Sequence, residues 1–157
     1  MGIGPSTKET TLHHFRDPLL EVVTSDNDVD LLGIIVAGTP QSNEDKVFVA
    51  ERAAAWAEAM RVDGVIVSID GWGNSNIDFA TAVGEVGRRN IPVVGMSFVG
   101  TVGYVVTNKY MDTIVDFNKS KEGIETEVVG ENTVTTIDAK KALAFLKLKM
   151  RNRRNEV

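Results

Sequence analysis

The chain has 157 residues, 43% of them apolar and 25% charged, which is the composition of an ordinary globular domain rather than a disordered chain. It contains no cysteine and its formal charge is −5, which excludes disulfides, Cys-ligated metal centres and thiol catalysis by this chain and gives no reason to expect nucleic-acid binding. Its longest apolar runs are too short to span a bilayer and its first residues lack the pattern of a secretory signal, so we expect no membrane association and a cytoplasmic location.

The first thirty residues are polar and rich in turn formers, so we expect an N-terminal arm over residues 1–30 that packs across a surface and contains a short helix near Pro18. The arm holds the only two histidines, His13 and His14, which we take together with Arg16 as candidates for contact with a partner or a site. Adjacent histidines in an extended segment point apart and no third ligand is near, so no metal site is expected. The alternative is a histidine that is simply hydrogen-bonded within a packed arm.

Three continuous apolar runs follow the arm, at residues 31–37, 64–69 and 91–98. Continuous runs, as opposed to alternating ones, are typical of parallel strands buried on both faces. Apolar residues at helical spacing fill the two intervals between the runs, with Ser42 or Asn43 as the cap of the first helix and Asn76 as the cap of the second. This order of elements predicts three parallel strands joined by two helices.

The pattern is weaker beyond residue 100. Short strands or extended segments are expected at 104–107, 113–117 and 126–129, followed by a last helix that Thr135 caps, with Asp138 as its acidic partner. We therefore predict a single three-layer α/β domain over 1–157 with a small, mainly parallel sheet of the flavodoxin-like or Rossmann-like type. Its parts are the arm 1–30, the core 31–137 and the C-terminal basic helix and tail 138–157.

Charge is distributed unevenly along the chain. Residues 138–157 carry seven Lys or Arg residues against two acidic ones, so the rest of the chain has a net charge of −10. Basic residues suit the negative end of the last helix, and a solvated helix end is one interpretation of the tail. The other is a docking patch, and with the arm it leads us to expect a homo-oligomer or a complex with other chains.

Ligands of open parallel sheets bind beyond the carboxyl ends of the strands. Three loops are expected at that edge, 38–43, 70–76 and 97–103, and each combines glycine with hydroxyl or amide side chains. Two of them lead into a helix N-terminus, where free backbone N–H groups favour a carboxylate or another anion. The candidate binding residues are Thr39, Asp70, Trp72, Asn74, Asn76, Ser97 and Thr101.

A purely structural interpretation of these loops stays open, because the same residue types are common turn and cap formers. Trp72, between two glycines, then serves as a lid over the following helix. Nucleotide binding is not predicted, because the loop 71–76 has Asn76 where a dinucleotide fingerprint needs its third glycine, and no phosphate-binding Gly-x4-Gly-Lys loop occurs.

Four strings of the sequence carry a resemblance to a known family: residues 2–19, 68–75, 106–112 and 125–132. Together they resemble the component B proproteins of the glycine, sarcosine, betaine and D-proline reductases, over residues 1 to about 150. The resemblance implies an origin in amino-acid reductases of Stickland-fermenting anaerobes. In that family a proprotein is cut at a cysteine that becomes a pyruvoyl group, which binds the substrate amine, while a separate selenoprotein subunit attacks the activated carbon.

This chain lacks the cysteine from which the family makes its pyruvoyl group, so we expect no cofactor and no catalytic residue of its own. It is most similar to the short accessory protein of the D-proline reductase cluster. The expected function is that of a subunit or accessory paralogue of a D-proline or glycine-type reductase, providing a substrate-side or docking surface. Its expected partners are the pyruvoyl-bearing and selenoprotein subunits or a second copy of itself.

For an amino-acid ligand, Asp70 is the expected acceptor for the amine, and Asn74 and Asn76 are expected donors to the carboxylate. Two other functions stay open: a non-catalytic module that binds or senses a small amino acid, and a structural assembly partner.

Overall fold

The computed structural model describes residues 17–69, 73–97, 106–117 and 134–155. The elements in chain order are α1 (Pro18–Thr24), α2 (Asn43–Ala59), β1 (Val65–Ser68), α3 (Ser75–Arg88), β2 (Val93–Ser97), β3 (Ile114–Asp116) and α4 (Thr136–Asn155). No helix in these ranges is long and apolar enough to cross a membrane.

The strands form one parallel sheet in the order β1-β2-β3, with Val65 beside Val93 and Gly95 beside Ile114. The central strand β2 is buried along its whole length, as its uninterrupted apolar sequence requires. The chain is therefore an α/β protein with a small parallel sheet, as the order of its elements predicts.

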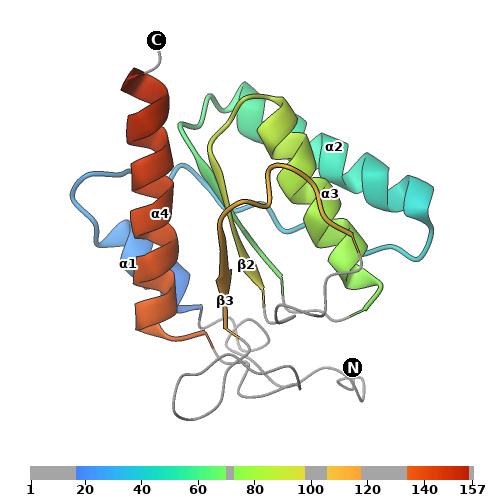
Figure 1. Ribbon diagram of the computed structural model, residues 1–157, viewed down its shortest axis with the longest axis horizontal. Helices are drawn as coiled ribbons and strands as arrows, with labels where there is room; N and C mark the ends of the chain where they lie inside the picture. Colours follow the sequence, from blue (N-terminus) through green and yellow to red (C-terminus); the bar gives the residue numbers. More distant parts are fainter. Residues whose placement is uncertain (1–16, 70–72, 98–105, 118–133, 156–157) are drawn as a thin grey trace.

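Helices cover both faces of the sheet and make three layers (Figure 1). On one face, α4 packs on the strands and α1 packs on α4, whereas α3 covers the other face with α2 beside it. The core on the α4 side joins Met96 and Phe117 to Leu146, and the core on the α3 side joins Phe79 and Val83 to Val93.

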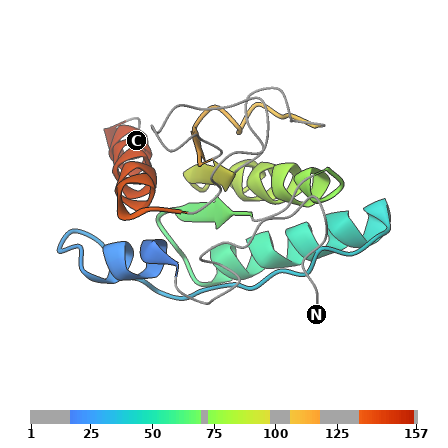
Figure 2. The same cartoon turned by 90° about the horizontal axis from the view of Figure 1, so that it is seen from below.

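The predicted strand at 31–37 is wrong. This segment has no strand or helix hydrogen bonding, and its side chains are exposed, with Val36 93% accessible. It runs alongside α2, on the side away from α3 (Figure 2). The apolar run signals a preference for burial, but a strand also requires its backbone to pair with a neighbouring strand, and this segment pairs with none of β1, β2 and β3.

The helix starts follow the predicted capping chemistry at two of three places. Ser42 caps α2 by accepting from the Asp45 amide, and Thr135 pairs with Asp138 at the start of α4. Asn76 does not cap α3, because the helix begins one residue earlier, at Ser75. The Asn76 side chain is buried inside the first turn, where its Oδ1 accepts from the Val106 amide at 3.2 Å.

Candidate functional site

The carboxyl ends of β1 and β2 and the first turns of α2 and α3 provide the polar side chains that this fold offers to a ligand. Two of the predicted binding residues lie there and are described: Asn76 on α3 and Ser97 at the end of β2, both fully buried. Buried polar groups of this kind need partners, so their presence at the strand ends indicates a built polar centre.

The other predicted residues are not brought to this centre by the described part of the chain. Thr39 and Asn74 are described and exposed, and Thr39 follows the segment that is not a strand. Six more lie outside the described residues: Asp70, Trp72, Thr101, His13, His14 and Arg16.

A buried ion pair, which the sequence analysis does not identify, joins α2 to α3. Lys46 is only 2% exposed, and its Nζ donates to Asp78 Oδ2 at 2.5 Å. Asp78 lies in the first turn of α3 and is 10% exposed. A lysine is almost never buried to this degree without a charged partner, because removing an ammonium from water costs far more free energy than removing a neutral polar group. The pair therefore fixes the start of α2 against the start of α3.

The burial of Lys46 is indicated in the sequence by its spacing from the alanines of α2. The buried stripe of α2 consists of Lys46, Ala50, Ala54 and Ala57, which recur at intervals of four, four and three residues. Val47, the apolar residue that follows Lys46, is exposed. A single charged residue in phase with a row of alanines is thus the feature that indicates a buried lysine with a partner elsewhere.

Asp78 Oδ1 is buried and has no hydrogen-bond partner among the described residues. Ser68 Oγ also lacks one there, but Ser68 lies on the same face of β1 as Ile66, which packs in the α4-side core, whereas Asp78 belongs to α3 on the other face. Lys46 occupies the second oxygen of Asp78 and leaves Oδ1 as an acceptor. A carboxylate oxygen that lacks a donor is suited to the N–H groups of an ammonium or secondary amine.

The described residues contain no group of three or more His, Asp or Glu side chains arranged to hold a metal ion. The hydroxyl, amide and carboxylate side chains of this centre are groups that can bind and orient a polar ligand.

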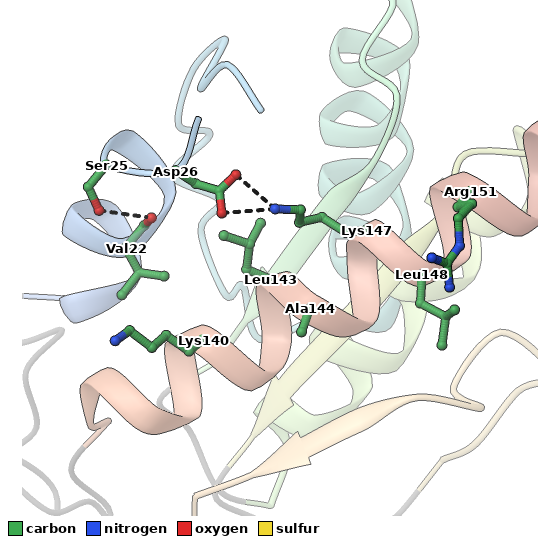
Figure 3. A pocket seen from close by; sticks show the side chains of 9 residues that line it. All are labelled: Val22, Ser25, Asp26, Lys140, Leu143, Ala144, Lys147, Leu148 and Arg151. Atoms are coloured by element: carbon green, nitrogen blue, oxygen red, sulfur yellow. Dashed lines mark hydrogen bonds and ion pairs between the residues drawn. The ribbon is translucent and has the colours of Figure 1, made fainter. Parts of the chain in front are cut away.

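A second hollow lies between α1 and α4, away from the strand ends (Figure 3). Lys147 crosses it and donates to both carboxylate oxygens of Asp26 at 2.9 Å and to Asp28 at 2.6 Å. The hydrogen bond from Lys147 lowers the pKa of Asp26, and the hydrogen bonds to Asp28 and Asp26 raise the pKa of Lys147. These charges satisfy one another, so this groove serves to attach α1 to α4.

Comparison with known proteins gives a consistent result. Residues 2–104 match the model of the glycine/sarcosine/betaine reductase component B subunits. The chain is 47% identical over 146 residues to the D-proline reductase proprotein PrdA of Acetoanaerobium sticklandii, an alignment that covers 92% of this chain and 23% of that protein. It is 28% identical over 78 residues to the sarcosine reductase complex component B subunit alpha of Peptoclostridium acidaminophilum, covering 48% of this chain and 18% of that subunit.

The chain thus spans less than a quarter of the length of either relative. No solved structure matches it significantly.

Proposed function

Because this chain belongs to the family of glycine/sarcosine/betaine reductase component B subunits, we propose that it is a subunit or accessory paralogue of a D-proline-type reductase that holds the amine end of an amino-acid substrate. The observation that carries this proposal is the buried Lys46–Asp78 pair, which leaves Asp78 Oδ1 as an acceptor without a donor at the sheet edge where ligands bind. The 47% identity to a D-proline reductase proprotein supports D-proline as the first substrate to test.

In this proposal the Asp78 carboxylate and the Lys46 ammonium have different roles. Asp78 Oδ1 accepts a hydrogen bond from the substrate ammonium. Lys46 donates to the other oxygen of Asp78 and so fixes the orientation of the carboxylate. The electron-accepting carbonyl and the reducing thiol or selenol come from partner subunits, because this sequence has no cysteine to supply either.

Isothermal titration calorimetry with D-proline tests the substrate-binding role. Titrations with glycine and sarcosine show which of the three amino acids binds most tightly. Asp78→Asn removes the charge of the acceptor and should weaken binding by about 1.5–3 kcal/mol, the value of one charge-assisted hydrogen bond. Asp70→Asn should weaken D-proline binding by a similar amount if Asp70 also accepts a hydrogen bond from the substrate amine. Asp63→Asn is the matched control, because Asp63 is exposed and lies before β1, at the opposite end of the sheet.

The outcome separates the proposal from its alternatives. Equal affinity of the Asp78→Asn and Asp63→Asn variants for D-proline would remove the strand-end centre from substrate binding. Binding by the isolated chain without retention of any reductase subunit from a native lysate would favour a sensor over a subunit.

A second function, that of an assembly partner, is favoured by a separate observation. Several large apolar side chains of α2 lie at the surface, including Phe48 and Trp56, and Trp56 is 63% exposed. Exposed aromatic side chains are enriched at protein interfaces. Phe48→Ser should then abolish co-purification of partner subunits while leaving the affinity for D-proline unchanged.

A further inference from the structure

β1 is an edge strand. Within the described residues it pairs with β2 alone. The amides of Val65 and Ile69 donate to β2, so the amides and carbonyls of the alternate residues Ile66 and Ser68 point away from it. An edge of this kind is a template for another parallel strand. The side chains of β1 are only half-buried, whereas those of β2 are fully buried.

The segment 31–37 has the composition of a strand but lacks a place in the sheet. It contains six apolar residues and one glycine, no charge and no proline, and nearly all of its side chains are exposed. Such a sequence gains most by backbone pairing and burial on both faces. A Cβ atom on Gly33 would lie 3.1 Å from Met60 Cε, so the segment already approaches the C-terminal end of α2.

α2 has a second apolar stripe a quarter-turn from the one that packs on α3. It consists of Val49, Ala53, Trp56 and Met60, at helical spacing, whereas the opposite side carries Glu51 and Glu58. Val49 and Ala53 are half-buried, and Trp56 and Met60 are exposed. In a parallel sheet a helix covers the two strands that it connects, and α2 connects the segment 31–37 to β1.

The lengths of the connections define a register. Seven positions separate Ser68, the last residue of β1, from Ser75, the first residue of α3. The same spacing counted back from Asn43, the first residue of α2, reaches Val36. Two consecutive strand–helix connections of equal length would place Val36 beside Ser68 and Ile35 beside Val67.

We propose that residues 31–37 dock parallel to the free edge of β1 as a fourth strand under the second apolar stripe of α2, and that docking carries Thr39 to the strand-end centre. The segment thus has two arrangements, the released one described above and a docked one. The second half of the proposal rests on the proposed function, because it makes docking the step that completes the substrate site.

A disulfide trap tests docking in a chain that contains no other cysteine. Neighbouring strands lie about 4.8 Å apart, within the range of roughly 4.4–6.8 Å between Cα atoms that a disulfide spans. The double variant Ile35→Cys/Val67→Cys should therefore form an intramolecular disulfide under mild oxidation. The control pair is Ile35→Cys/Leu148→Cys, because Leu148 is an exposed residue of α4 on the other face of the sheet.

The expected result is a monomeric cross-linked product that forms about tenfold or more faster than in the control, as effective concentration requires for neighbouring groups. Equal rates in the two pairs would overturn docking. A disulfide-linked dimer as the main product would also overturn it, since the segment would then pair with a second copy.

Hydrogen exchange on the unsubstituted chain is the second measurement, and it does not depend on the folding of a variant. Docking in this register predicts slower exchange at the amides of Ile35 and Ala37, which would donate to the carbonyls of Ile66 and Ser68, than in a free peptide of the same sequence. Exchange at the free-peptide rate would contradict it. D-proline should increase this protection if docking completes the site. Protection that is present but insensitive to D-proline would contradict only the link to the substrate, so the two proposals fail separately.

Discussion

Lys46 and Asp78 form a pair in which each charge depends on the other. Lys46 is buried, Asp78 is only 10% exposed, and Lys46 is among the largest side chains that the described core encloses. Removal of one partner leaves an uncompensated charge in a poorly solvated place, whereas removal of both leaves a space that apolar atoms can fill.

A thermodynamic cycle on this pair should show strong coupling. We expect Asp78→Leu to lower the free energy of unfolding by about 3–5 kcal/mol, because it strands the Lys46 ammonium in the interior. The double variant Lys46→Met/Asp78→Leu should recover most of that loss. Urea unfolding followed by circular dichroism measures these two variants and Lys46→Met alone. Additive effects of the two substitutions would show that the charges do not depend on each other.

The carboxylate of Asp26 makes the attachment of α1 sensitive to acid. The folded-state pKa of Asp26 lies below its ordinary value, mainly because Lys147 donates to it, so its contribution to stability is complete above the ordinary value and is lost as pH falls through the folded-state pKa. The pKa of Lys147 is raised, so its contribution is complete below the ordinary lysine value and disappears as pH rises through the raised one. The pKa of Asp17 is raised by burial, which acts in the opposite direction on acidification.

The pH dependence of Asp26→Asn isolates this effect from that of Asp17. Wild type should be more stable than the variant at neutral pH, and the difference should shrink towards zero as Asp26 of the wild type becomes protonated. Urea unfolding at a series of pH values measures the difference. A gap that stays constant throughout the acid range would mean that the Asp26 charge does not stabilise the fold.

At the scale of elements, two helical glycines allow the segment 106–111 to lie on α3. A side chain at Gly87 would overlap the ring of Tyr110, and Gly84 faces Asn108, whose amide donates to the Ala80 carbonyl at 2.7 Å. This close approach leads the chain into β3 on the open side of β2. Glycine has a lower helix propensity than alanine, so these two positions lower the intrinsic stability of α3 but allow the close contact with residues 106–111.

Gly87→Ala should lower the free energy of unfolding by about 1–2 kcal/mol, because overpacking against Tyr110 outweighs the gain in helix propensity. Combining it with Tyr110→Ala should relieve the overlap, so that Gly87→Ala is no longer destabilising in that background. Gly38→Ala is the control, because no atom lies within 4 Å of the Cβ position there. Thermal unfolding compares the four proteins, and an unchanged midpoint for Gly87→Ala would exclude the contact.

Sequence patterns predict an element well here when its neighbours along the chain are also its neighbours in space. β1, α3 and β2 form one consecutive unit and match the prediction, as does the capping box of Thr135 and Asp138. The segment 31–37 and Lys46 do not, because their state depends on groups elsewhere: a strand edge for the segment and the carboxylate of Asp78 for the lysine. The residue types show that a segment favours burial or that a buried charge requires a partner. Only the tertiary structure shows whether the burial or the partner is present.

At the scale of the whole molecule, the prediction concerns catalysis. The purified chain should show its encoded mass, fail to react with hydrazine reagents and leave D-proline unconverted in the presence of a dithiol. Reductive removal of the ring amine needs an electron sink on the nitrogen and a soft nucleophile at carbon, and the cysteine-free sequence supplies neither. Turnover by the chain in the absence of other subunits would require a different mechanism.

Assembly is a second prediction at this scale. The acidic body, the basic helix α4 and the exposed apolar residues of α2 lead us to expect a stable oligomer or a complex with reductase subunits. Light scattering of the isolated chain and affinity purification from a native anaerobe provide the measurement. A 17 kDa species that retains nothing from the lysate would contradict it.

The packing of α1 against α4 has a consequence for biosynthesis. Val22 is buried by Ala139 and Leu143, and Asp26 pairs with Lys147, which lies 121 residues further along the chain. At about 5–20 residues per second, a ribosome needs roughly 6–24 s to make the second half of this contact after the first has emerged. During that interval α1 has no surface on which to pack, and a 7-residue helix is too short to persist alone. α1 is therefore among the last helices to form, and a nascent chain stalled before residue 136 should remain cleavable by protease around Asp26 after its central strands have become resistant.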